Sequence, residues 1–207
     1  GVRYVMIGGS AFMNTQTNRQ KQALATKQKI FSCAISLFAR QSYENVTVQD
    51  ICAEADVSVG AFYHHFKSKE NILDEGYRLF DHESEDVWNN GHPDSPREAV
   101  RFLIAEQAHS MENMGVMAAL QYFKNQLSSS EKYILNPDRF FYRTLYRIID
   151  EAVASGILAG DAAVITEDIL GTTRGLIYDW CLHEGSYVLS EKSLRILDIL
   201  LDHYQKK

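Results

Sequence analysis

The segment from Thr47 to Lys69 carries the side chains whose types and spacing best fit a chemical task, the binding of phosphate oxygens and base edges. It reads TVQDICAEADVSVGAFYHHFKSK. Hydroxyl groups stand at the starts of two short helix signatures, Tyr63 and His64 occupy polar positions of the second, and cations follow at Lys67 and Lys69. Hydroxyls at helix starts and cations bind the DNA backbone, while side chains of a second helix reach the bases. The segment therefore predicts a helix-turn-helix that binds double-stranded DNA.

Two helix starts must position these side chains. Thr47 and Ser58 can each cap a helix through a side-chain oxygen that accepts a hydrogen bond from the backbone. Hydrophobic residues flank each cap at the positions of a hydrophobic staple, namely Val46 with Ile51 and Val57 with Phe62. Asp56 lies where the chain must reverse, and aspartate tolerates the left-handed backbone conformation better than most residues. Two helices joined by so short a turn must cross steeply.

The longer stretch TVQDICAEADVSVGAFYHHFKSKENIL resembles the N-terminal DNA-binding segment of the TetR family of bacterial transcriptional repressors, and KQKIFSCAISLFARQSYENV resembles the first helix of that family. The resemblance implies a regulator, expected to be a repressor, that binds a palindromic DNA operator as a homodimer, is released by a small-molecule effector and uses no cofactor. It implies that Thr47 and Ser58 hydrogen-bond phosphates. It also implies that Tyr63 and His64 face the DNA and that Lys69 opens the next helix against the DNA backbone. The residues expected to contact DNA are Lys29, Thr47, Ser58, Val59, Gly60, Ala61, Tyr63, His64, Lys67 and Lys69.

Two positions depart from the pattern of the family. Val59 and Ala61 stand where the family often has a lysine or arginine and a threonine or serine. Hydrogen bonds to base edges should therefore be poorer, and contacts with thymine methyl groups should matter more. Ser42 replaces the usual glycine after the first helix, which would cost about 1 kcal/mol if that residue is left-handed.

The charge of the chain is divided between its two parts. The net charge is −6, which is unusual for a DNA-binding protein. Residues 15–69 contain seven basic and four acidic residues, whereas residues 70–207 contain 13 basic and 23 acidic residues. The basic end is thus the end that is expected to bind DNA, and the acidic remainder should stay away from phosphates.

Helical periodicity runs through almost everything after Arg19, and no segment shows the alternation of a strand. We therefore predict an all-α fold of about nine helices. Residues 1–20 are expected to be disordered or an arm, 21–69 to form the three-helix DNA-binding domain, and 70–207 to form a larger helical domain for effector binding and dimerisation. No apolar run is long enough to span a bilayer, and the three cysteines form no spaced framework. These features predict a cytoplasmic protein with no membrane partner.

The last two predicted helices, at about 161–184 and 190–205, carry more apolar surface than one protomer needs. Gly171 and Gly175 are four residues apart, a spacing that lets another helix approach closely. The resemblance also implies dimerisation through these helices, as a four-helix bundle. The residues expected at the dimer interface are Ile169, Gly171, Gly175, Leu194, Leu197, Leu201 and Tyr204.

The middle helices are rich in aromatic residues and methionines, most of which we expect to be ordinary core. Polar residues among them could orient a ligand within an apolar cavity, and the family has an effector cavity in this region. The hypothesis is that a small, partly aromatic or amphiphilic molecule binds there. The residues expected to line this cavity are Glu106, His109, Met114, Met117, Gln121, Tyr122, Tyr142, Tyr146, Arg174 and Tyr178.

Other classes of protein fit the sequence less well. No nucleophile, phosphate-loop or metalloprotease motif points to an enzyme. His64 and His65 are adjacent, so on a helix they point about 100° apart and cannot close on one metal ion. A helical adaptor with a degenerate helix-turn-helix stays open as the alternative, because Val59 and Ala61 weaken the polar reading surface.

Overall fold

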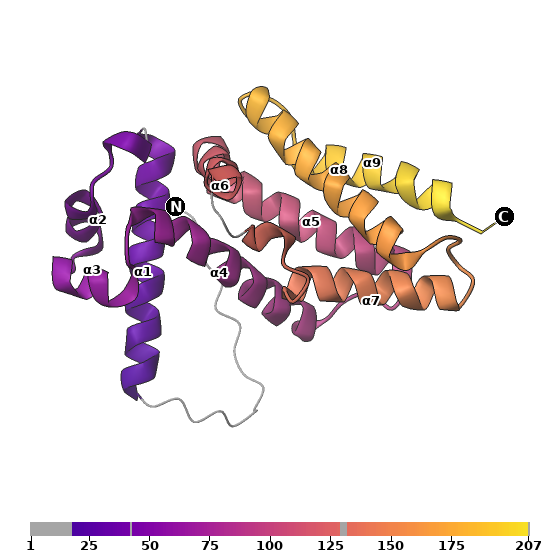
Figure 1. The fold of residues 1–207 in the computed structure, drawn as a ribbon, viewed down its shortest axis with the longest axis horizontal. Helices are drawn as coiled ribbons and strands as arrows, with labels where there is room; N and C mark the ends of the chain where they lie inside the picture. Colours follow the sequence, from indigo (N-terminus) through magenta and orange to yellow (C-terminus); the bar gives the residue numbers. More distant parts are fainter. Residues whose placement is uncertain (1–17, 42, 129–131, 207) are drawn as a thin grey trace.

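The structure is a computed structural model, and it describes residues 18–41, 43–128 and 132–206. Within these ranges it contains helices and no strand, which confirms the all-α prediction (Figure 1). The α-helices are α1 (Asn18–Arg40), α2 (Val48–Ala55), α3 (Val59–His65), α4 (Lys69–Asn90), α5 (Pro96–Met114), α6 (Val116–Ser128), α7 (Phe140–Ala154), α8 (Ala162–Leu182) and α9 (Leu189–Tyr204). Two short 3-10 helices, η1 (Tyr43–Asn45) and η2 (Tyr133–Leu135), lie between them.

Helices α1 to α3 form one end of the molecule, and α4 leads from them into the bundle of α5 to α9 (Figure 1). Helix α1 begins at Asn18, so the last three residues of the predicted arm are helical. The rest of that predicted arm, and Ser42, lie outside the described residues. No helix in the described part is long and apolar enough to cross a membrane.

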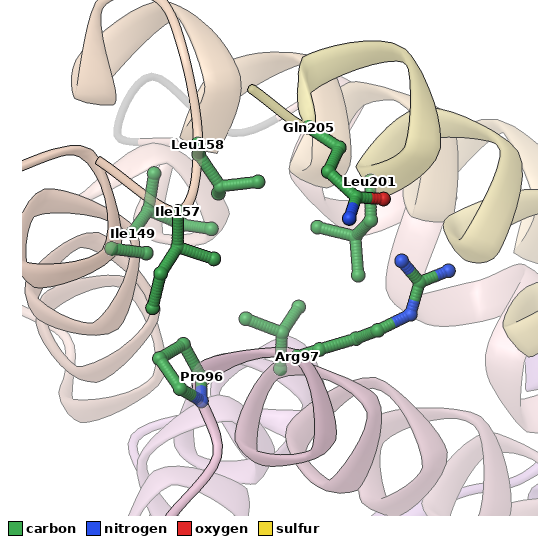
Figure 2. Close-up of a pocket in the computed structure, with 9 residues that line it drawn as sticks. Pro96, Arg97, Ile149, Ile157, Leu158, Leu201 and Gln205 are labelled. Carbon is green, nitrogen blue, oxygen red and sulfur yellow. The ribbon is translucent and has the colours of Figure 1, made fainter. Parts of the chain in front are cut away.

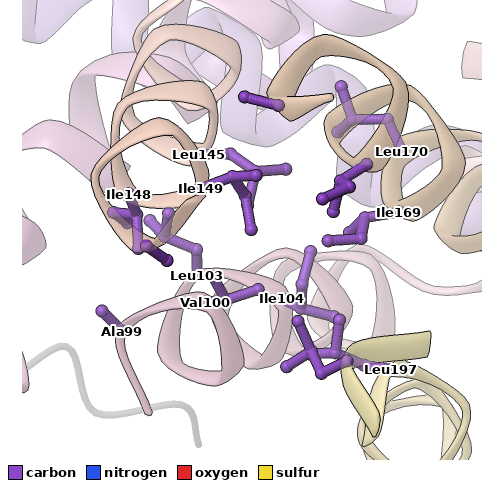
Figure 3. Close-up of a cluster of buried hydrophobic side chains, with 14 of the residues drawn as sticks. Ala99, Val100, Leu103, Ile104, Leu145, Ile148, Ile149, Ile169, Leu170 and Leu197 are labelled. Atoms are coloured by element: carbon purple, nitrogen blue, oxygen red, sulfur yellow. The ribbon is translucent and has the colours of Figure 1, made fainter. Parts of the chain in front are cut away.

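The core of the larger domain is built from the apolar faces of α5, α7, α8 and α9 (Figure 3). Leu103, Leu145, Ile165 and Ile149 are fully or almost fully buried there. Burying an aliphatic side chain of this size stabilises a fold by about 1.5–3 kcal/mol. These contacts hold the four helices together as one body.

A second core joins helices α1 to α3 to the start of the larger domain. It contains Ile30, Phe38 and Phe62 from α1 and α3, and it continues into Tyr77 of α4 and Tyr122 of α6. An ion pair between α1 and α4 adds to this junction, with 2.6 Å between Lys27 Nζ and Glu75 Oε1. The predicted boundary near residue 70 is therefore crossed by continuous packing.

A buried ion pair fixes the start of α7 against α4. The Arg139 guanidinium donates from Nε to Asp81 Oδ2 and from Nη2 to Asp81 Oδ1, both at 2.8 Å. Its carbon Cζ also lies 5.2 Å from the Tyr77 ring centre and 5.4 Å from that of Tyr133. Both partners are almost fully buried, so removing either one would leave an unpaired charge in the protein interior.

Three of the residues predicted for the dimer interface lie inside the protomer instead. Ile169, Leu197 and Leu201 are at most 2% exposed, and the first two point into the core in Figure 3. They occupy the inner stripe of α8 and α9, which faces α5 and α7. By contrast, Gly171 and Gly175 lie on the open face of α8, where an added Cβ would meet no atom within 4 Å.

Candidate nucleic-acid interface

The start of α2 is a capping box. Thr47 is extended (φ −99°, ψ 162°), and its Oγ1 accepts from the Asp50 backbone N at 3.1 Å. In return, Asp50 Oδ2 accepts from the Thr47 N at 2.8 Å and from the Thr47 hydroxyl at 2.7 Å. These hydrogen bonds from Thr47 lower the pKa of Asp50. The predicted cap is confirmed, but the hydroxyl proton is already donated to a carboxylate, so Thr47 must release Asp50 before it can donate to a phosphate.

The turn between α2 and α3 is left-handed at Asp56, as predicted. Its backbone angles are φ 50° and ψ 54°, and its N–H donates to the Ala53 carbonyl at 3.3 Å. The following N–H, of Val57, donates to the Cys52 carbonyl at 3.0 Å. These bonds satisfy carbonyls at the end of α2 and fix the angle at which α3 leaves.

Ser58 caps α3 and keeps a donor available. Its Oγ accepts from the Ala61 N at 3.1 Å. The residue is exposed, and its hydroxyl proton has no protein acceptor among the described residues. Ser58 can therefore donate to a phosphate without breaking its own cap, unlike Thr47.

The outer face of α3 presents neutral side chains. Val59 is 41% exposed and Tyr63 is 56% exposed, and His64 is exposed beside them. Phe62 is fully buried on the opposite face and anchors the helix in the second core. His65 is half-buried, and burial lowers its pKa, with smaller effects from His64 and Lys27. The face that could enter a groove is thus apolar and aromatic.

Lys69 has a structural task that the sequence did not suggest. Its Nζ donates to the carbonyls of Tyr43 at 2.7 Å and Val46 at 2.9 Å, and it lies 4.2 Å from the Tyr43 ring centre. The ammonium thus braces the connection between α1 and α2 with two of its three donors. The contact of Lys69 with the DNA backbone stays a prediction. Lys29 and Lys67 are exposed cations at this end of the molecule.

Comparisons with known proteins agree with this geometry. Residues 30–75 match the sequence model described as bacterial regulatory proteins, tetR family. The HTH-type transcriptional regulator AcrR of Shigella flexneri is 25% identical over 205 residues, covering 89% of this chain and 92% of AcrR. The uncharacterised HTH-type regulator YerO of Bacillus subtilis is 47% identical over 47 residues, covering 23% of this chain and 16% of YerO.

The segment that forms the helix-turn-helix, residues 30–75, belongs to the TetR family. The matched residues run from α1 to α4 and include most of the second core, both capped helix starts and the left-handed turn at Asp56. A solved structure of the FadR regulator of Bacillus subtilis, in complex with stearoyl-CoA, has a TM-score of 0.63 at 20% identity. It covers 84% of this chain and 97% of FadR, so the likeness in fold extends through the larger domain.

The residues predicted for the TetR-type effector cavity are not gathered at one hollow. Tyr122 and Gln121 are buried in the protomer, while Met117, Tyr146 and Tyr178 are each at least 38% exposed. None of the ten lines either of two hollows found in the described part of the chain. Two of them, Tyr142 and Arg174, do meet through the carboxylate of Glu167. Glu167 lies 3.5 Å from Arg174 and hydrogen-bonds Tyr142, whose pKa is raised by burial and by this carboxylate.

Two contributors to the interface were missed at the sequence level. Asp50 completes the capping box, and the spacing of a threonine three residues before an acid could have revealed it. Tyr43 supplies a carbonyl and a ring to Lys69 from 26 residues away, and no local pattern signals that contact. No group of three or more metal-ligating side chains is gathered within the described ranges.

Proposed function

We propose that this protein is a cytoplasmic TetR-type transcriptional repressor. It binds a palindromic operator as a homodimer, is released by a small-molecule effector and catalyses no reaction. The observation that carries the proposal is the exposed face of α3, a helix that begins at the Ser58 cap and is anchored on a buried core. Such a helix is the element that enters the major groove in helix-turn-helix proteins.

The side chains divide between phosphate and base contacts. Ser58, Lys29 and Lys67 are exposed donors that suit phosphate oxygens. Val59 and Tyr63 suit apolar contacts in the groove, where the thymine methyl group is the apolar feature. Because α3 (Val59–His65) carries no arginine or lysine, we expect base discrimination to depend on methyl contacts and on DNA shape.

Dimerisation would use the outer stripe of α8. This stripe carries Val164 at 54% exposure, Tyr178 at 52% and Leu182 at 63%, with Gly171 and Gly175 between them. Apolar side chains around two glycines suit the close approach of a helix from a second copy. A two-fold dimer presents its two α3 helices to half-sites about 34–36 Å apart or a multiple of that distance.

Effector binding would part the middle helices of the larger domain. FadR of Bacillus subtilis was solved with stearoyl-CoA, which supports a ligand site in a fold of this kind. For this chain we propose a partly aromatic or amphiphilic molecule between α5 and α8 and against α7, near Tyr142 of α7 and Arg174 of α8. An effector shifts the dimer towards release only if it binds the released conformation more tightly.

Fluorescence anisotropy with DNA from upstream of the gene tests the proposal. We expect specific binding that weakens as salt increases, because phosphate contacts release counterions. Tyr63→Ala and Lys67→Ala should weaken binding, whereas Lys124→Ala, which removes an exposed lysine from α6, should not. Failure to bind any upstream fragment would favour the adaptor alternative.

A further inference from the structure

A small cavity lies at the end of the bundle away from α1 to α3. It is lined by the start of α5, the end of α7, the connection between α7 and α8, and the end of α9 (Figure 2). Its volume is about 80 Å³. The walls are apolar and include Val100, Ile149, Ala152, Leu158 and Leu201. A single water needs about 10–15 Å³ and two to four polar partners, so this space is large enough for several waters but would hold them poorly.

One side of the cavity is fixed by backbone hydrogen bonds. The Ala159 N donates to the Tyr204 carbonyl at 2.7 Å, and the Lys206 N donates to the Ile157 carbonyl at 3.2 Å. These bonds join the connection between α7 and α8 to the last residues of α9. This wall of the cavity is therefore a fixed stretch of backbone, and not two helices that can move independently.

The charged side chains at the mouth of the cavity disfavour an anionic ligand. Arg97 Nη2 lies 3.1 Å from Asp198 Oδ1 and 2.8 Å from Asp202 Oδ1, and Arg101 also pairs with Asp198. The Arg97 guanidinium in Figure 2 is thus occupied by two carboxylates of the same protomer. An anionic ligand would have to compete with both carboxylates for it and would be repelled by them.

One polar group at the cavity remains available. The side chain of Gln205 lines the mouth and makes no hydrogen bond to protein within the described residues. Its amide can donate and accept, so it can pair with a hydroxyl or a carbonyl group. A single neutral amide would not compensate a charged group for its loss of hydration.

We propose that this cavity binds a small uncharged molecule, of the size of one aromatic ring or a short alkyl chain, with at most one neutral polar group placed at Gln205. Apolar cavities of about 150 Å³ in proteins stay dry and bind benzene or xenon. This cavity has about half that volume, so a single ring is the largest ligand that it can take, with the edge of the ring at the open mouth. The site is separate from the effector site proposed between α5 and α8. Its occupancy can be measured without DNA, so its failure would not affect the repressor assignment.

Methyl NMR of the full chain, titrated with benzene and separately with benzoate, tests the proposal. Benzene should give saturating shifts confined to methyls around the cavity, such as those of Ile149, Leu158 and Leu201. Benzoate should bind at least about tenfold more weakly, a difference of about 1.4 kcal/mol. Shifts that do not saturate, or that spread over the whole protein, would overturn the site, and equal binding of benzoate would overturn its selectivity for uncharged ligands.

Two variants fill the cavity in different ways. Ala152→Leu adds volume from the buried wall, and Ile157→Phe places a ring at the mouth from a position that is 46% exposed and tolerates a larger side chain. Each should weaken benzene binding by at least about tenfold. Leu135→Phe, a comparable change at a 54% exposed residue of η2, is the control and should bind as the unmodified chain does. If Ala152→Leu does not fold, Ile157→Phe decides the question, and unchanged benzene binding in it would refute the proposal.

Discussion

Replacing Gly76 by alanine should destabilise the protein, even though alanine is the better helix former. Gly76 lies inside α4, and a Cβ built on it would lie 1.4 Å from Tyr122 Oη and 2.4 Å from Tyr122 Cζ. Tyr122 is 2% exposed, and its hydroxyl has no hydrogen-bond partner among the described residues. Its ring therefore cannot swing into solvent to make room, and it would have to press into the second core.

The size of the effect follows from these distances. Ordinary contact begins near 3.4 Å, so the hydroxyl would have to move by about 2 Å. Overpacking of a core costs about 1–3 kcal/mol, and a shift this large belongs at the upper end. Alanine regains about 1 kcal/mol over glycine in a helix interior. We therefore expect Gly76→Ala to lower the free energy of unfolding by about 2 kcal/mol.

The variant Tyr122→Phe separates the overlap with the Tyr122 hydroxyl from other effects of Gly76→Ala on stability. In the unmodified chain it removes a buried hydroxyl without a partner, so stability should stay the same or rise. Combined with Gly76→Ala it removes the closest overlap, and the two changes should be coupled by about 1 kcal/mol.

Urea unfolding at one fixed protein concentration, followed by tryptophan fluorescence, measures all these variants. Gly60→Ala is the control, because a Cβ there meets no atom closer than Ser58 Oγ at 3.9 Å. If Gly76→Ala is as stable as Gly60→Ala and shows no coupling with Tyr122→Phe, the close contact between α4 and α6 is wrong.

Three further changes have distinct outcomes. Arg139→Met should lower the free energy of unfolding in urea by about 3–5 kcal/mol, because it leaves Asp81 charged and buried. Adding Asp81→Leu should restore most of that stability, and additive losses in the double variant would contradict the pairing. Lowering the pH through 6.5 should lower the Tm, because burial lowers the pKa of His65 and the unfolded chain then binds more protons. His65→Gln should reduce that pH dependence, and an identical pH profile would refute the cause. Gly175→Arg should convert the proposed dimer to a monomer in sedimentation, because Gly175 lies on the open face of α8; a dimer of unchanged strength would place the interface elsewhere.

Features set by neighbouring residues were predictable from the sequence. The caps at Thr47 and Ser58 and the left-handed turn at Asp56 were expected, because each depends on residues within a few positions. The order of the helices was also predictable from apolar periodicity, and glycines follow the ends of α4, α5, α7 and α8. The start of α7 was less clear, because a proline favours the first turn of a helix but α7 begins three residues after Pro137, at Phe140.

Features set by distant residues were not predictable. Helices α8 and α9 each carry two apolar stripes, and the sequence does not say which one faces the core, so Ile169 and Leu197 were assigned to the wrong surface. The ammonium of Lys69 meets carbonyls 23 and 26 residues away, which no local pattern encodes. The apolar cavity likewise depends on four segments that meet only in the folded chain.

The central claim is that two copies of α3 read two halves of a palindrome. Hydroxyl-radical footprinting on DNA from upstream of the gene measures this directly. We predict two symmetrical protected half-sites whose centres are about 10–10.5 base pairs apart or a multiple of that, and Tyr63→Ala should lose both together. Absence of protection, or a single half-site protected by the dimer, would contradict it.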